Sequence, residues 1–197
     1  PADPETGALA VMESDQNLLI RYLTSFAVPS AGSRDGYVYH TLTAYPTARD
    51  VHPVGPEVHQ RPGRVVIYLL GPADDLVTPE TVQIVRERVM RPNVKPLTDE
   101  VIVSAATIIP YEVELNIRVP RGPAPAMVAE AARTAVMRAA AARFAIGAHV
   151  HVNALEGAAY VANVLRVHRV GPAGDIVAGP GEAPLCTDVK INVEVET

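Results

Sequence analysis

A strand-type and a helix-type pattern of hydrophobic residues alternate along this chain of 197 residues. Strict alternation of apolar and polar residues predicts a half-buried strand at Tyr111–Val119, and a continuous apolar run between two glycines predicts a central strand, buried on both faces, at Arg64–Leu70. Further strands are expected at residues 48–54, 100–104, 164–170 and 188–196. The strand signals therefore fall into an early and a late group.

Apolar residues at helical spacing lie between these strands. They predict helices at residues 14–26, 33–45, 78–91, 124–144 and 153–162. Ser14, Ser33, Thr78 and Asn153 are the expected N-caps, and Gly147 is expected to close the long helix. One stripe on the first helix consists of large apolar side chains: Leu18, Leu19, Tyr22, Leu23 and Phe26.

Helices and strands alternate in a way that predicts an α+β protein with two small domains. Each domain is expected to be a sheet of about three strands covered by helices on one face. Residues 1–30 form an N-terminal tail and connecting helix, 31–106 a central domain and 107–197 a C-terminal domain. Residues 1–13 are expected to be a tail, 55–63 a loop and 171–184 a mobile loop. Sheets this small are close to the lower limit of independent stability, so a neighbour should complete their burial.

Composition removes several function classes. The net charge of −5 argues against a nucleic-acid-binding protein. No apolar run is long enough for a membrane span, and the start has no secretory signal pattern. The first residue is not Met, so the chain is expected to be a piece of a longer protein. A single cysteine excludes an internal disulfide and suits a reducing cytosol.

Histidines are the first candidates for chemistry. His149 and His151 form an H-x-H pair that could supply two metal ligands, with a third from His168 or an acid. The favoured interpretation is two solvent-facing side chains. His52 and His59 are placed in a loop at a partner surface, and His40 on the polar face of a helix.

The remaining candidates are acids and one thiol. Glu112 and Glu114 share one face of the alternating strand and are interpreted as exposed polar positions. Cys186 has no basic neighbour in the sequence and is interpreted as a packed side chain. No phosphate-binding or nucleophile-elbow motif is present. The sequence thus predicts no catalytic residue, no cofactor-binding residue and no metal ligand.

Three short segments carry a resemblance to a known family. They are Asp15–Leu23, an acidic-start helix containing an arginine; Pro29–Tyr39, an S-x-G-S-x-x-x-Y pattern; and Lys95–Val101, an R-P-L-T-D-x-V turn with Lys for Arg. Downstream, the order of strand, long helix, I-G-x-x-V, short helix, V-x-R-V strand and G-P turn also fits. The chain resembles the baseplate J-like proteins of contractile-tailed phages from about residue 2 to 197. It departs from them in lacking a region before Pro1 and in its longer loop 171–184.

This resemblance implies a structural wedge component of a tail baseplate. Such a protein binds copies of itself and other wedge or hub proteins, and it has no active site, cofactor, small-molecule substrate, nucleic acid or membrane partner. It is located in the virion baseplate, and in the host cytoplasm during assembly. Two alternatives stay open: a ligand-binding or regulatory protein with two ferredoxin-like modules, and a metal-dependent enzyme using His149 and His151.

Overall fold

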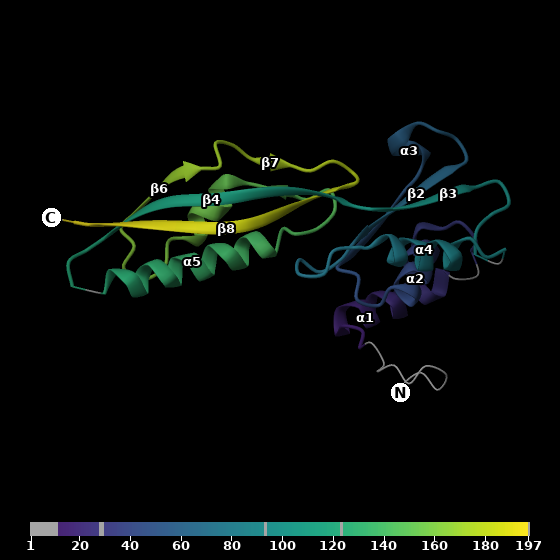
Figure 1. Ribbon diagram of the computed structural model, residues 1–197, viewed down its shortest axis with the longest axis horizontal. Coiled ribbons are helices and arrows are strands. Elements are labelled where there is room, and N and C mark those ends of the chain that lie inside the picture. Colours follow the sequence, from purple (N-terminus) through teal and green to yellow (C-terminus); the bar gives the residue numbers. More distant parts are fainter. Residues whose placement is uncertain (1–11, 28–29, 93, 123, 197) are drawn as a thin grey trace. The chain divides into compact units, whose positions relative to one another are not determined.

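The computed structural model describes residues 12–27, 30–92, 94–122 and 124–196 (Figure 1). Its contacts separate the chain into two units that meet between Ala106 and Thr107. Of the predicted tail 1–13, residues 1–11 lie outside the described residues. That residues 1–30 form a separate segment stays a prediction. None of the described helices is long and apolar enough to cross a bilayer.

The first unit is built on a mixed sheet of three strands. Its strands are β1 (Asp50–Val54), β2 (Arg64–Leu70) and β3 (Glu100–Ala105), in the order β1-β2-β3. Strand β2 is antiparallel to β1 and parallel to β3, and α4 (Pro79–Val89) makes the crossover between the parallel pair. The apolar run predicted as a central strand is therefore confirmed in that position. The expected burial on both faces was wrong, because Val65, Val66 and Tyr68 are only partly buried.

Helices of the first unit begin where the sequence predicts their caps. At the start of α1 (Asp15–Thr24) the Ser14 hydroxyl accepts a backbone N–H at 3.1 Å. The Ser33 hydroxyl does the same for α2 (Arg34–Ala44) at 3.1 Å, and the Thr78 hydroxyl for α4 at 3.3 Å. A 3-10 turn, η1 (Ser25–Ala27), follows α1. The predicted loop 55–63 contains a short helix, α3 (Pro56–His59), so the loop prediction was wrong there.

A core lies between the first sheet and the helices α2 and α4, which lie on the same side of it (Figure 1). It consists of the following buried side chains: Tyr37, Ile67, Leu69, Val85, Val89, Val101 and Val103. Because one face of the sheet is covered by helices, apolar side chains concentrate there.

The second unit is a mixed sheet around one long central strand. Strand β4 (Thr107–Val119) lies between β6 (Arg166–Gly171), which is antiparallel to it, and β8 (Glu182–Val195), which is parallel. Helix α5 (Pro125–Ala141) runs along β8 (Figure 1). A smaller sheet pairs β5 (His149–Val150) with β7 (Ile176–Val177), and α6 (Val152–Ala158) follows β5. The predicted α+β class, with two three-stranded sheets and helices packed against them, is confirmed.

Strict alternation along β4 has the predicted effect on burial. Tyr111, Val113, Leu115, Ile117 and Val119 are all buried, while the residues between them face solvent wholly or in part. The buried side packs against α5, whose contact positions are small or β-branched: Val128, Ala132, Val136 and Ala140. Small side chains allow the helix to lie close to the sheet.

Three predictions in the second unit were wrong in detail. Loop 171–184 contains β7 and the start of β8, so it is tied down by strand pairing. Helix α6 starts at Val152 without an Asn153 cap, because the Asp175 carboxylate accepts the Val152 N–H at 2.9 Å. Helix α5 ends at Ala141; Gly147 instead has φ of +70° in the following turn, and its N–H donates to the Glu182 carbonyl.

The placement of His40 was also wrong. This residue of α2 is 6% exposed, not on a polar face. The pKa of its imidazole is lowered by burial first and by the positive charges of Arg88 and Arg91 second. The ring is therefore held in its neutral form within the first unit.

The neutral His40 predicts acid sensitivity. Its pKa is lower in the folded protein than the ordinary 6.5, so the unfolded chain binds an extra proton as pH falls below that value. We expect the free energy of unfolding to decrease between pH 7.5 and 5.5, and to decrease less in His40→Gln, measured by urea denaturation. His149→Gln, which makes the same substitution at an exposed histidine, is the control for the substitution itself. Equal pH dependence in parent and His40→Gln would contradict the assignment.

Candidate interaction surfaces

Two of the segments singled out in the sequence pack against each other in the first unit. The ring of Pro96 lies against Gly32, where an added Cβ would come within 2.5 Å of the proline Cγ. Gly32 also has φ of +78°, a conformation that favours glycine. Both the space and the backbone conformation therefore require glycine at this position.

A hydrogen bond strengthens the same contact. The Tyr37 hydroxyl donates to Asp99 Oδ2 at 3.3 Å across 62 sequence positions, and Tyr37 is 2% exposed. Burial, and then the Asp99 charge, raise the pKa of the Tyr37 phenol far above its ordinary value, so the hydroxyl stays a donor. Lys95 Nζ donates to the Asp99 carbonyl at 2.9 Å, which closes the turn on itself. We call residues 95–99 the anchored turn.

The anchored turn presents one large apolar side chain to solvent. Leu97 is 96% exposed. On one side of it Pro96 packs against Gly32, and on the other Asp99 is hydrogen-bonded by Tyr37 and Lys95. A leucine presented on a fixed backbone loses little conformational entropy when it enters a partner's pocket. This is an arrangement suited to protein–protein contact.

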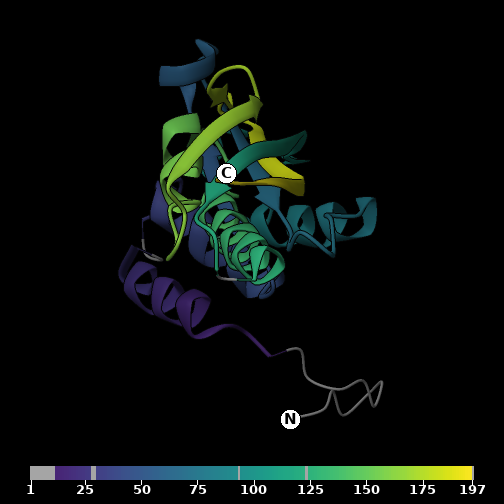
Figure 2. The same ribbon diagram turned by 90° about the vertical axis from the view of Figure 1, so that its left-hand side faces the viewer.

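Helix α1 shows the reverse of ordinary amphipathic packing. Its buried residue is polar: Asn17 Nδ2 donates to the carbonyls of Pro46 and Ala48, each at 2.8 Å. The apolar stripe of α1 continues into η1 and is 52–74% exposed; it comprises Leu18, Leu19, Tyr22, Leu23 and Phe26. Figure 2 shows α1 at the margin of the first unit. The sequence predicted the stripe, but it could not show that the stripe faces outward. Contiguous exposed apolar surface of this kind is typical of an interaction site.

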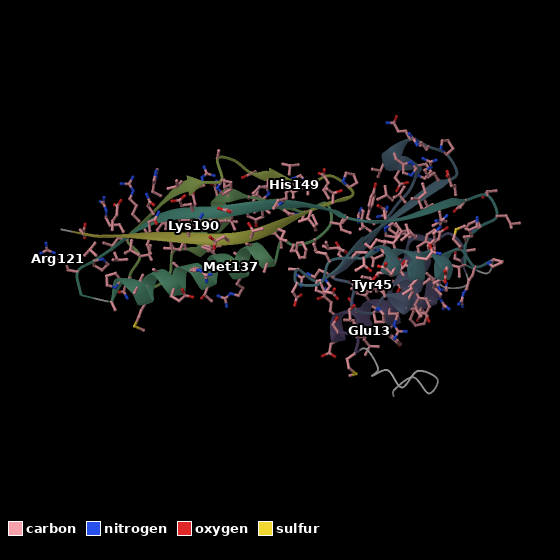
Figure 3. All side chains as sticks on the ribbon, in the orientation of Figure 1. Glu13, Tyr45, Arg121, Met137, His149 and Lys190 are labelled. Atoms are coloured by element: carbon pink, nitrogen blue, oxygen red, sulfur yellow. The ribbon has the colours of Figure 1, made fainter. Side chains whose placement is uncertain are left out.

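The open face of the second sheet is polar and internally paired. Lys190 Nζ lies 3.0 Å from Glu112 Oε2, and Asn192 Nδ2 donates to Glu114 Oε1 at 3.0 Å (Figure 3 labels Lys190 on β8). Arg118 and Glu194 form a looser ion pair at 3.7 Å. Glu112 and Glu114 thus have cross-strand partners, which fits exposed polar positions on a sheet rather than a pair of catalytic acids.

The H-x-H histidines have separate positions. His151 Nδ1 lies 2.8 Å from Asp175 Oδ2, and the same carboxylate caps α6. His151 first, and the Val152 N–H second, lower the pKa of Asp175. His149 is exposed on β5 (Figure 3). His168 is on β6, in a shallow cavity of about 270 Å³ on the open face of the second sheet. Within the residues that the structure describes, no three His, Cys, Asp or Glu side chains are grouped as metal ligands.

The other candidates have local structural contacts. Cys186 Sγ donates to the Asp188 carbonyl at 3.4 Å, and burial is the main cause that raises the pKa of this thiol, which disfavours a nucleophilic thiolate. His52 lies in β1 opposite Tyr68, and His59 ends α3 and accepts the Arg61 N–H at 3.2 Å. The prediction that both lie in a loop was wrong.

Comparison with known proteins identifies a similar sequence. No family model matches the chain. Over 195 residues the chain is 29% identical to baseplate protein J of Escherichia phage P2. The match includes 97% of this chain and 63% of the phage P2 protein, so the chain spans less than two thirds of that relative's length. The predicted resemblance is confirmed as homology to baseplate protein J.

The anchored turn generates a stability prediction. Gly32→Ala should destabilise the protein by about 2 kcal/mol or more, because it adds a clash to an unfavourable backbone conformation. Tyr37→Phe should cost about 1 kcal/mol through loss of the hydrogen bond to Asp99 Oδ2. Leu97→Ser changes a fully solvated side chain and should leave the urea midpoint unchanged. A Gly32→Ala protein as stable as its parent would show that Pro96 does not hold the turn against α2.

Proposed function

We propose that this protein is a structural component of a contractile-tail baseplate. The similarity to baseplate protein J of phage P2 supports this proposal most strongly, because it extends over 97% of the chain. A baseplate component acts through its contacts and needs no reactive group. On this proposal the protein is located in the tail baseplate of the particle, and in the host cytoplasm during assembly.

The described surfaces suit a protein that is completed by neighbours. Two exposed apolar features, Leu97 and the α1 stripe, lie in the first unit, and the second unit presents an open sheet. We propose that the chain associates with copies of itself and with other wedge or hub proteins around the tail. Apolar side chains in the centre of a contact and paired charges around it are the usual composition of such interfaces.

The same observations support a protein that is not an enzyme. Asp175 caps a helix and contacts His151, Cys186 packs beside Asp188, and the acids of β4 pair across the sheet. These side chains thus have structural contacts in the fold. Homology to a structural baseplate protein points in the same direction.

One observation favours the ligand-binding alternative. A cavity of about 320 Å³ lies between the anchored turn, α2 and the end of β1, lined by residues that include Arg34, Arg64 and Asp99. Its two arginines are already paired, Arg34 with Glu57 at 3.1 Å and Arg64 with Glu100 at 2.8 Å. An anionic metabolite would have to compete with these carboxylates, so we prefer the assembly role.

Association with tail proteins tests the proposal. The purified chain is mixed in turn with the products of the genes that neighbour its own, and complexes are measured by size-exclusion chromatography and light scattering. We expect a complex with at least one tail protein, and Leu97→Asp should weaken it about tenfold or more by placing a charge in an apolar contact.

A matched control separates this effect from general surface change. Met127 of α5 is 75% exposed, so Met127→Asp also replaces an exposed apolar side chain with a carboxylate, and it should leave the affinity unchanged. Neighbouring genes for metabolic enzymes, or a chain that stays separate from every tail protein of its genome, would contradict the proposed function. Thermal stabilisation by a metabolite, lost in Arg34→Ala, would favour the ligand-binding alternative instead.

A further inference from the structure

Strand β8 is an edge strand whose outer side is open over its second half. Among the described residues it pairs with β4 and with no other strand. The Glu196 N–H donates to the Val119 carbonyl, which shows that even-numbered residues here direct their backbone groups toward β4. Backbone groups of alternate residues point to opposite edges, so those of Val189, Ile191, Val193 and Val195 point outward.

The earlier half of the strand is different. The Glu182 carbonyl already accepts a hydrogen bond from Gly147, and a register shift in the β4–β8 pairing lies between Cys186 and Asp188. After Asp188 the pairing with β4 runs without a shift to Val195. This second half has no proline and no bulge, two of the devices with which proteins block an edge. We call residues 189–195 the open edge.

We propose that the open edge pairs antiparallel with the open edge of a second copy of this chain, around a two-fold axis at Asn192. In this register Ile191 lies opposite Val193 of the other copy, and Val189 lies opposite Val195. All four are residues whose N–H and C=O groups point outward, so each of these pairs exchanges two backbone hydrogen bonds. Val195, which is 46% exposed in the single chain, gains an apolar neighbour.

Charge selects this register. With the axis at Asn192, each Lys190 lies opposite a Glu194 of the other copy on the polar face. An axis at Ile191 would oppose Asp188 to Glu194, and an axis at Lys190 would oppose two lysines, so both are disfavoured. An axis at Val193 keeps opposite charges together, but within residues 189–195 it leaves only three facing pairs of outward residues instead of four.

The faces of the two sheets agree in the proposed pair. A two-fold axis perpendicular to the sheet places both α5 helices on the same side and both polar faces on the other. An axis between two residues would place odd-numbered residues opposite even-numbered ones. It would therefore set apolar side chains of one copy against polar side chains of the other, which is incompatible with a sheet that has its core on one face. The result is a continuous sheet of six strands with a single apolar side. Contacts of this isologous kind are self-complementary and suit a protein that assembles with copies of itself.

The inference deepens the proposed function and rests on it, because it names the contact through which copies associate. Its test uses the chain by itself, so it is independent of binding to other tail proteins. Sedimentation velocity between about 5 and 200 µM should show a monomer–dimer equilibrium. Val193→Pro should remove the dimer, since the lost N–H points outward and makes no bond to β4. An unchanged circular dichroism spectrum confirms that the variant is folded.

A disulfide test identifies the register. In a Cys186→Ser background, Asn192→Cys should give oxidised dimers, because residues at the axis in a non-hydrogen-bonded pair have Cα atoms about 4.5 Å apart. Lys190→Cys is the matched control. Position 190 of one copy lies opposite position 194 of the other, so the two introduced cysteines are four residues apart along the strand, roughly 13 Å, and should not cross-link. A chain that is monomeric at every concentration, a dimer that survives Val193→Pro, or equal cross-linking of both cysteine variants would overturn the inference.

Discussion

One-sided burial is the constraint on which the rest of this structure depends. Each of the two larger sheets has three strands, with β2 or β4 in the middle, and helices cover one face of each. From Tyr111 to Val119 the alternation of apolar and polar residues along β4 places the large apolar side chains on the α5 side. The opposite face must then satisfy itself with cross-strand pairs such as Glu112–Lys190. A layer of this kind folds around its core but leaves edges and an outer face available to neighbours.

The first unit depends on a second long-range contact, between the start of α2 and the anchored turn. Glycine at position 32 allows Pro96 to approach, and Tyr37 holds Asp99 from within the core. These are residues of the segments that carry the resemblance to baseplate J-like proteins. Their arrangement indicates that these residues act by fixing backbone geometry around an exposed leucine.

Much of the fold could be predicted because its signals are local. The caps at Ser14, Ser33 and Thr78 and the alternation of β4 need only neighbouring residues, and all are confirmed. Errors occurred where a distant residue decides the outcome. Asp175 replaces the expected cap of α6 from 23 positions away, and burial against α4 makes His40 a core residue. Helical spacing on α1 predicted a stripe, but the Asn17 side chain, bonded to two distant carbonyls, turns that stripe outward.

The candidate surfaces differ in how they could recognise a partner, and this difference bears on specificity. Leu97 and the α1 stripe offer apolar area, which gives affinity but discriminates little between apolar partners. The open edge of β8 offers backbone hydrogen bonds in one register, with Lys190 and Glu194 penalising the registers beside it. Most charges on the described polar face are already compensated within the chain, so long-range attraction can contribute little to binding. The choice of partner must then depend on shape and on strand register. A repeated assembly needs this property, because every copy presents the same surfaces and only one relative placement can be productive.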